Sequence, residues 1–253
     1  MGILDGKVAL VTGAGQGVGQ GIAFAFAKEG ARIAAIGRTE SKLVDTVTQV
    51  QGFGGTAISV VADVNDMADI QRSIDQTLAA FGRIDILVNN AYGIALGPLL
   101  SLSDADFERC MTGSPLATFR YMKACHPHLK AAGDGAIINL STSATRRWDA
   151  ANYGFYAASK RAVEALSRAA ASEWGQDGIR VNTIAPHALS PSLKGWIEAN
   201  PAEAKEFFKT IPLGRVGDCE HDIGAAALFL ASPAARYVTG VVLPLDCGQA
   251  FFG

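Results

Sequence analysis

The first thirty residues constrain the fold more than any other part of the chain. Residues 7–12 (KVALVT) form a short apolar run, typical of a strand buried on both faces. A glycine-rich turn over 13–19 follows directly and leads into a predicted helix over 20–28. Such glycines let a pyrophosphate approach the amides of a helix N-terminus, although similar turns also occur without a ligand. Strand, glycine turn and helix together predict the first unit of a parallel α/β sheet.

The end of the second predicted strand, over 31–36, carries a cue to the cofactor. Gly37 and Arg38 follow this strand, where NAD-binding chains usually have Asp or Glu for the ribose 2′-hydroxyl. An arginine at this point accommodates a 2′-phosphate, although an arginine in a loop can equally be solvated. We therefore expect NADP to be preferred, with NAD possible.

Strand-like and helix-like segments alternate along most of the chain. Hydrophobic residues make up 49% of its 253 residues, and no linker or repeat interrupts the alternation, so we expect a single dinucleotide-binding catalytic domain over 1–253. The predicted fold is an α/β, doubly wound, mostly parallel Rossmann-type sheet of about seven strands. The expected strands span 7–12, 31–36, 56–61, 84–88, 136–140, 179–184 and 238–245.

The alternation fails over 188–217, where three prolines punctuate polar and aromatic segments. Long irregular segments in compact α/β domains often serve as lids or substrate-binding elements. We therefore expect substrate specificity to reside in an irregular insertion here.

Composition argues against several classes of partner. The net charge is -2 and no basic run is present, so nucleic acid is not expected. The four cysteines are scattered without a C-x-x-C pair, which argues for reduced thiols and against a metal site. No segment is apolar for eighteen or more residues, so a cytoplasmic location away from membranes is expected.

Candidate catalytic groups follow several predicted strands. Tyr156 and Lys160 are four residues apart near the start of a predicted helix, so they share one face, where a fixed cation would stabilise a phenolate. Such pairs are also common as surface decoration. Asn89 and Ser141 lie at the ends of the fourth and fifth predicted strands. Because the carboxyl ends of parallel strands meet at one edge, we expect these groups to share one crevice.

Taken together, the motifs make the chain resemble the short-chain dehydrogenase/reductase family over nearly its whole length. TGAGQGVG is similar to the family's T-G-x-x-x-G-x-G cofactor turn, NNAY to N-N-A-G, and YAASK to Y-x-x-x-K. AIINLS, RVNTIAP and YVTGVVLPLDCG also resemble family segments in the expected order. Any one of these motifs is weak, but six in sequence are specific.

The resemblance implies a role for each catalytic residue. Tyr156 exchanges a proton with the substrate oxygen, and Lys160 lowers the pKa of the phenol and binds the nicotinamide ribose. A hydroxyl polarises the carbonyl. Counting thirteen residues back from the tyrosine selects Ser143, with Ser141 in reserve, whereas matching the strand end as N-x-S-S selects Thr142.

The resemblance also implies the cofactor contacts. They come from the glycine turn, from the ends of later strands and from the catalytic helix. The expected residues are Gly13, Gln16, Gly17, Val18, Gly19, Arg38, Asp63, Val64, Asn89, Ala91, Tyr156, Lys160, Pro186 and Ala188.

Three residues depart from the family pattern. Ser114 stands where the family has an asparagine that supports a proton-relay water, and we count it as a catalytic candidate because a hydroxyl can still hold water. Tyr92 and His187 replace glycines beside the nicotinamide, where they add bulk or a proton donor, unless His187 serves only in packing. Arg146, Arg147 and Trp148 border the same pocket and suit an acidic or aromatic substrate, although an arginine pair in a loop is more often solvated.

The expected function is an oxidoreductase that transfers hydride between NADP(H) and a small-molecule alcohol or ketone. The alternatives are a regulatory or scaffold protein that binds the cofactor without turnover, and, less favoured, a dehydratase or epimerase. The resemblance further implies a homo-oligomer, expected to be a tetramer, in which Phe251 and Phe252 would be buried.

Overall fold

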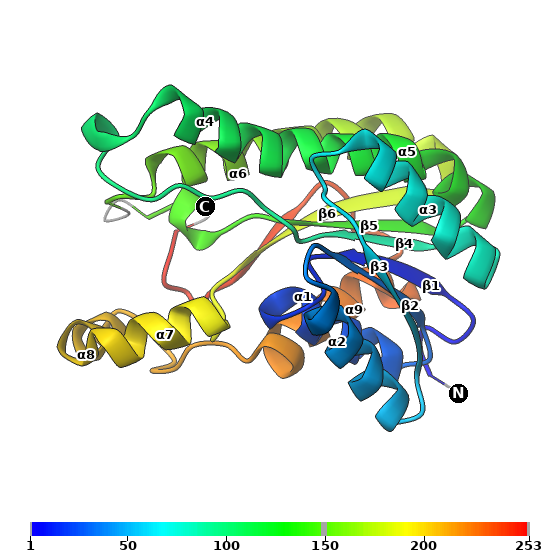
Figure 1. Ribbon diagram of the computed structural model, residues 1–253, viewed down its shortest axis with the longest axis horizontal. Coiled ribbons are helices and arrows are strands. Elements are labelled where there is room, and N and C mark those ends of the chain that lie inside the picture. Colours follow the sequence, from blue (N-terminus) through cyan, green and yellow to red (C-terminus); the bar gives the residue numbers. More distant parts are fainter. Residues whose placement is uncertain (1, 148–150, 252–253) are drawn as a thin grey trace.

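Over the described residues, 2–147 and 151–251 of this computed structural model, the chain forms a parallel sheet of seven strands. Their order is β3-β2-β1-β4-β5-β6-β7, and helices cover both faces, as Figure 1 shows. The strands are β1 (Val8–Thr12), β2 (Arg32–Gly37), β3 (Thr56–Val61), β4 (Ile86–Asn89), β5 (Gly135–Leu140), β6 (Ile179–Pro186) and β7 (Val242–Leu245). The predicted α/β doubly wound sheet is thereby confirmed.

The main helices divide between the two faces of the sheet. One face is covered by α1 (Gly17–Lys28), α2 (Glu40–Gly52) and α9 (Ala225–Ala231). The opposite face is covered by α3 (Met67–Phe81), α5 (Ala117–Ala132) and α6 (Gly154–Trp174), with α4 (Asp104–Met111) beyond the sheet. No helix of the described chain has the length and apolarity needed to cross a membrane.

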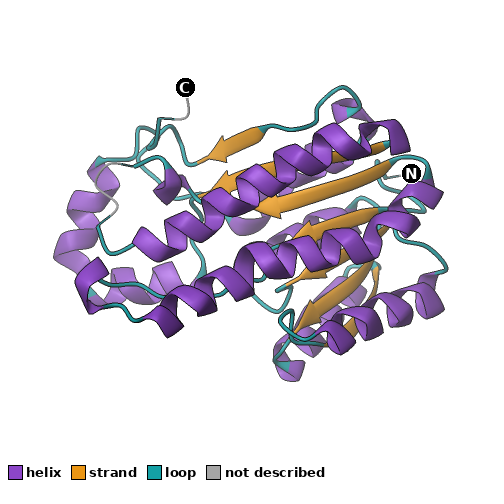
Figure 2. Cartoon of the chain, turned by 90° about the horizontal axis from the view of Figure 1, so that it is seen from above, coloured by secondary structure: helices purple, strands orange, loops and turns teal. Residues whose placement is uncertain are grey.

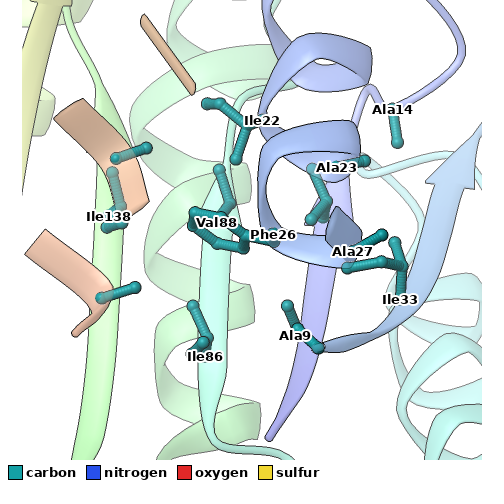
Figure 3. Close-up of a cluster of buried hydrophobic side chains, with 14 of the residues drawn as sticks. Ala9, Ala14, Ile22, Ala23, Phe26, Ala27, Ile33, Ile86, Val88 and Ile138 are labelled. Carbon is teal, nitrogen blue, oxygen red and sulfur yellow. The ribbon is translucent and has the colours of Figure 1, made fainter. Parts of the chain in front are cut away.

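The apolar runs of the central strands account for this layered arrangement. All five residues of β1 are buried, because helices pack on both faces of that strand. Figure 3 shows Ile22 and Phe26 of α1 facing Val88 of β4, and all three side chains are fully buried. Burying a side chain of this size stabilises the fold by about 1.5–3 kcal/mol.

The prediction for residues 188–217 is wrong in one respect, because much of this segment is helical. It contains α7 (Pro191–Ala199) and α8 (Pro201–Lys209). The two prolines occupy the first turns of these helices, where the missing N–H costs nothing, and Ser190 caps α7 by accepting from the Leu193 N–H at 3.3 Å. Two of the prolines that punctuate this segment therefore begin helices.

Wide π-helical turns precede two of the helices. The turn η2 (Thr112–Leu116) leads into α5, and the turn η5 (Cys219–Gly224) leads into α9. Turns of this kind often occur at functional sites. The last predicted strand is also shorter than expected, since Gly240 has a φ of +74° and β7 begins after it.

The topology fixes where a ligand can lie. The chain order reverses between β1 and β4, which are neighbours in the sheet. In Figure 2 the strand arrows all point toward the same edge, and Figure 1 shows α7 and α8 extending beyond that edge. Open α/β sheets bind ligands at such a switch point, outside the carboxyl ends of the strands.

Candidate active site

The glycine turn after β1 brings two backbone segments into close contact. Gly13 has a φ of +67°, and a Cβ there would lie 2.6 Å from the Asn90 side-chain nitrogen. A Cβ on Gly19 would lie 2.4 Å from the Gly13 carbonyl oxygen. Larger residues at these positions would push the turn away from α1, so the glycines are required by packing as well as by conformation.

Asn90 holds this turn in place. Its side-chain amide donates to the carbonyl oxygens of Thr12 at 3.0 Å and Gly13 at 3.1 Å. In return the Thr12 hydroxyl accepts from the backbone N–H groups of Asn90 and Ala91, at 3.0 and 3.1 Å. The predicted cofactor contact Ala91 is thereby fixed directly beside the glycine turn.

The N-terminus of α1 suits a pyrophosphate. Within the described chain, no side chain caps its first amides, Gln16 at the N-cap included, and no acidic residue occupies its first turn. Gly17 starts the helix with a φ of +59° and Val18 follows it. The exposed amides and the helix dipole therefore favour an anion at this point.

A lysine that the sequence prediction overlooked lies at the same turn. The Lys42 ammonium, on the first turn of α2, donates to the Gln16 side-chain oxygen at 2.5 Å. Arg38 is exposed just after β2. The helix α1 and the strand β2 separate Lys42 from the glycine turn in the sequence, so residue spacing does not indicate that the two are close. The pairing of β1 with β2 brings Arg38 and Lys42 to the end of the sheet where the glycine turn lies.

Other predicted cofactor contacts lie along the same edge. Asp63 follows β3, and its carboxylate accepts from the Asn65 N–H at 2.9 Å. Val64 stands between them and packs against the core on the α3 face. Asn89 is buried and donates to Asn139 on the neighbouring strand at 2.8 Å, so its side chain links the ends of β4 and β5.

Tyr156 and Lys160 lie together at the start of α6. The Lys160 ammonium is buried and donates to the Leu140 carbonyl oxygen at the end of β5, at 2.8 Å. It lies 5.8 Å from the centre of the Tyr156 ring and 5.2 Å from that of Tyr92, within reach of cation–π attraction to both. The sequence prediction that this pair shares one face of a helix is confirmed.

Burial shifts both groups toward their neutral forms. It lowers the pKa of Lys160 to about 7 and raises the pKa of Tyr156 above its ordinary value, with the nearby Tyr92 adding to the rise. The pKa of the phenol therefore rises overall, and the lowering by Lys160 that the resemblance implies does not prevail in this structure. Desolvation outweighs the attraction of a lysine that directs its ammonium to a carbonyl oxygen.

The Lys160 shift predicts how stability depends on pH. Between about pH 7 and 10.5 the unfolded lysine binds a proton that the folded lysine lacks, so the free energy of unfolding rises with pH across this window. The cost of burying the charged Lys160 ammonium lowers the free energy of unfolding in full below pH 7 and not at all above 10.5. Relative to Lys160→Met, the wild type should gain up to about 1.4 kcal/mol per pH unit. Urea unfolding of both proteins at several pH values checks this; a constant difference between them would contradict it.

The structure brings the Thr142 side chain, which the strand-end match selects, to the Tyr156 phenol, where it lowers the pKa of the phenol in part. A catalytic part for Ser143 stays a prediction. The Ser141 hydroxyl donates instead to Glu164 at 2.5 Å, and Ser143 is buried where the 3₁₀ turn η3 (Ser143–Thr145) begins. The geometry thus favours the strand-end match over the count of thirteen residues, because pairing with β6 fixes the end of β5 and the residue that directly follows it.

Ser114 lies within the π-helical turn η2 and is completely buried. Its hydroxyl donates to the Gly93 carbonyl oxygen at 3.5 Å, and the Gly93 N–H donates to the Gly113 carbonyl oxygen at 3.0 Å. A Cβ on Gly113 would lie 2.7 Å from the Gly93 backbone. Ser114 therefore braces the segment that carries Tyr92.

Tyr92 and His187 make different contacts. The half-exposed Tyr92 ring lies 5.7 Å from that of Tyr156 and beside the Lys160 ammonium. The His187 ring packs 5.1 Å from Phe207 of α8, and burial lowers its pKa. His187 therefore has the packing role that was the simpler of its two expected roles, although its contact links the site to the α7–α8 segment.

The remaining predicted contacts lie beside His187. Pro186 ends β6, and Ala188 forms an isolated parallel bridge with Gly217, which closes the base of the α7–α8 segment. The guanidinium of Arg147 lies 5.7 Å from the centre of the Phe207 ring. Trp148 lies outside the described residues.

Known proteins resemble this arrangement closely. A family model described as enoyl-(acyl carrier protein) reductase matches residues 13–250. The 12α-hydroxysteroid dehydrogenase of a Clostridium species is 38% identical, with 98% of each chain covered. The D-threitol dehydrogenase of Mycolicibacterium smegmatis is 41% identical, with 97% of this chain and 93% of that protein covered.

The likeness extends to solved structures. A 7α-hydroxysteroid dehydrogenase in complex with NADH and 7-oxoglycochenodeoxycholic acid superimposes with a TM-score of 0.91 at 34% identity. The match covers 97% of this chain and 94% of that one. The fold of nearly the whole chain therefore has a counterpart in a chain solved with NADH and 7-oxoglycochenodeoxycholic acid.

Proposed function

The chain belongs to the short-chain dehydrogenase/reductase family, and from this premise we propose that it is an NADP(H)-dependent oxidoreductase that interconverts a secondary alcohol and its ketone. The observation that carries the proposal is the convergence of Thr142, Tyr156 and Lys160 at the carboxyl edge of the sheet, beside the uncapped N-terminus of α1. The relatives reported above are named as dehydrogenases, so a scaffold protein without turnover is not favoured.

The residues around the glycine turn fit a nicotinamide dinucleotide. The amides of Gly17 and Val18 would hold the pyrophosphate, since the turn leaves no room for side chains at Gly13 and Gly19. Ala91, Pro186 and Ala188 would line the path of the nicotinamide, and Asp63 and Val64 that of the adenine. When bound, the cofactor supplies or accepts the hydride.

Tyr156 acts as the acid in ketone reduction. Its raised pKa keeps the phenol protonated at neutral pH, ready to donate a proton to the substrate oxygen as that oxygen gains negative charge. The Thr142 hydroxyl donates a hydrogen bond to the same oxygen and orients the carbonyl. Lys160, with a pKa of about 7, replaces the proton that Tyr156 gives up. In alcohol oxidation the same groups work in reverse.

We propose NADP over NAD because two cations flank the expected position of the 2′-phosphate, Arg38 after β2 and Lys42 at the start of α2. Arg38→Leu should raise the KM for NADPH about 10- to 100-fold, the amount expected for the loss of one charge-assisted contact. The KM for NADH should change little. Steady-state kinetics with both cofactors check this; equal losses for NADPH and NADH would contradict a 2′-phosphate contact. Arg32→Leu, on the far end of β2, is the matched control.

The substrate class follows from the walls of the site. Tyr92, Trp196 and Phe207 supply aromatic surface, and Trp196 packs on Phe207 at 5.7 Å within the α7–α8 segment. We propose that this segment, over about 188–217, acts as a lid on the domain spanning 1–253. Aromatic walls favour a medium-sized hydrophobic alcohol, in the manner of the steroid substrates named for two of the relatives.

We also propose a homo-oligomer, expected to be a tetramer, in the reducing cytoplasm. Exposed apolar side chains lie along α4 and α5, among them Phe107 and Phe119, and Phe251 is exposed near the end of the chain. Phe252 lies outside the described residues. All four cysteines carry free thiols, which agrees with a reducing compartment. Sedimentation equilibrium tests the assembly, and a monomer would contradict it.

A panel of ketones tests the activity directly. NADPH consumption should be measured with cyclic ketones, steroid ketones and open-chain sugar ketones at equal concentration. Turnover with at least the cyclic members is the expected result. Tight binding of NADPH in calorimetry without turnover across the panel would favour a binding protein and contradict the proposal.

A further inference from the structure

A buried carboxylate, Glu164, joins helix α6, which carries Tyr156 and Lys160, to the turn that carries Thr142. Glu164 lies on α6, four residues after Lys160 and eight after Tyr156, so the three share one stripe of the helix. Its side chain is only 7% exposed. A carboxylate is expensive to bury unless its oxygens are hydrogen-bonded, so the contacts of this residue need an explanation.

Those contacts lie on both sides of Thr142 in the sequence, and the Thr142 side chain interacts with the Tyr156 phenol. One oxygen of Glu164 accepts from the Ser141 hydroxyl at 2.5 Å and from the Thr145 hydroxyl at 3.1 Å. Ser141 comes immediately before Thr142, and Thr145 comes three residues after it. The second carboxylate oxygen faces Arg161 at 3.3 Å and Arg146 at 3.6 Å.

Between Ser141 and Thr145 the chain forms a tight turn. The Thr142 hydroxyl accepts from the Ala144 N–H at 3.3 Å, and the Thr142 carbonyl oxygen accepts from the Thr145 hydroxyl at 2.9 Å. The Thr145 hydroxyl has one proton, which it shares between this carbonyl oxygen and the Glu164 carboxylate, and the Thr145 N–H also donates to the Thr142 carbonyl oxygen at 3.2 Å. Thr145 therefore contacts both Thr142 and Glu164. A shift of α6 relative to the turn would separate Thr142 from Tyr156. Glu164 opposes such a shift because it lies on α6 and accepts hydrogen bonds from Ser141 and Thr145, on either side of Thr142.

We propose that Glu164 is a positioning residue of the active site, which fixes the Thr142 hydroxyl against Tyr156 by holding the hydroxyls of Ser141 and Thr145. This role rests on the proposed oxidoreductase function. It also gives Ser141 a structural part, as the anchor of the catalytic turn. The effect is on orientation, and displacements of about 1 Å can cost about 100-fold in rate.

Two substitutions separate geometry from charge. Glu164→Leu removes the acceptor and should lower kcat about 10- to 100-fold, with the affinity for NADPH unchanged. Glu164→Gln keeps an oxygen for Ser141 and Thr145 and loses mainly ion pairs with partly exposed arginines, so kcat should stay within about 3-fold of the wild type. Glu173→Leu, an exposed position on the same helix, is the matched control.

A double-mutant cycle tests whether Glu164 acts through Thr142. In a Thr142→Ala background the hydroxyl to be positioned is gone, so adding Glu164→Leu should lower kcat by less than about 3-fold further. Independent losses that multiply to the full product would overturn the proposal. So would a Glu164→Leu enzyme with wild-type kcat.

Hydrogen exchange provides a readout that needs no turnover. The amides of Ala144, Thr145 and Arg146 are hydrogen-bonded within the turn. Glu164→Leu should speed their exchange, while Glu164→Gln and Glu173→Leu should not. If the wild type proves inactive but exchange follows this pattern, the proposed function fails and the bracing role stands. Unchanged exchange in Glu164→Leu would refute the bracing role itself.

Discussion

Tyr156→Phe should lower kcat for ketone reduction about 1000-fold, within the range attributed to general acid–base catalysis. The substitution removes the proton donor and keeps the ring, which packs against Tyr92 at 5.7 Å and lies beside the Lys160 ammonium. The affinity for NADPH and the free energy of unfolding should therefore change little. Single-turnover kinetics and calorimetry on the same preparation measure the two effects separately.

Tyr153 provides the control for this result. Its ring lies 6.4 Å from that of Tyr156, so it shares the same surroundings, but Ala157 stands where a lysine would be needed one turn later. Tyr153→Phe should keep most of the activity. If Tyr156→Phe stays within about 10-fold of the wild type, the acid role belongs to another group.

Gly19→Ala should cost the protein most of its affinity for the cofactor. The added Cβ would lie 2.4 Å from the Gly13 carbonyl oxygen and 2.5 Å from the Asn90 side chain, neither of which can move without opening the turn. Overpacking of this kind lowers the free energy of unfolding by about 1–3 kcal/mol. A comparable loss in binding, about 3 kcal/mol, corresponds to a Kd for NADPH about 100-fold higher.

Gly52→Ala separates this effect from glycine replacement in general. Gly52 lies on α2, and no atom stands within 4 Å of a Cβ built there. Alanine is the better helix former by up to about 1 kcal/mol, so this variant should be as stable as the wild type or more so, with NADPH binding unchanged. Calorimetry and urea unfolding of both variants decide the matter. Wild-type affinity in Gly19→Ala would contradict a cofactor seated on this turn.

The fold could be predicted from sequence because its signals are local. Buried parallel strands appear as short apolar runs, and the glycine turn marks where the first strand meets its helix. The helices over 188–217 were missed for an equally local reason. Pro191 and Pro201 resemble interruptions of the strand and helix pattern in the sequence. A proline in the first turn of a helix, however, loses no hydrogen bond.

The parts of the site that were missed depend on tertiary structure. The preference for Thr142 over Ser143 depends on where β5 ends against its neighbours in the sheet, which a count of residues back from the tyrosine does not give. Lys42 reaches Gln16 only because β1 pairs with β2. The raised pKa of Tyr156 reflects burial, which a spacing of four residues on a helix does not reveal.

The departures from the family pattern acquire physical roles in this structure. Ser114 stands where the family has an asparagine, and its hydroxyl donates to the Gly93 carbonyl oxygen in the neighbouring loop. Tyr92 covers the catalytic pair, and His187 packs on Phe207. Of the three, Tyr92 is the residue whose ring lies beside Tyr156, whereas His187 joins the end of β6 to the α7–α8 segment.

Isotope transfer tests the central claim most directly. The protein should be incubated with a ketone that it turns over and with NADPH deuterated at the transferable C4 position, and the product analysed by mass spectrometry. One deuterium should appear on the carbinol carbon for each NADPH oxidised, and Tyr156→Phe should slow its appearance about 1000-fold. Product formed without deuterium or without net consumption of NADPH, as in a dehydration or epimerisation, would contradict the account.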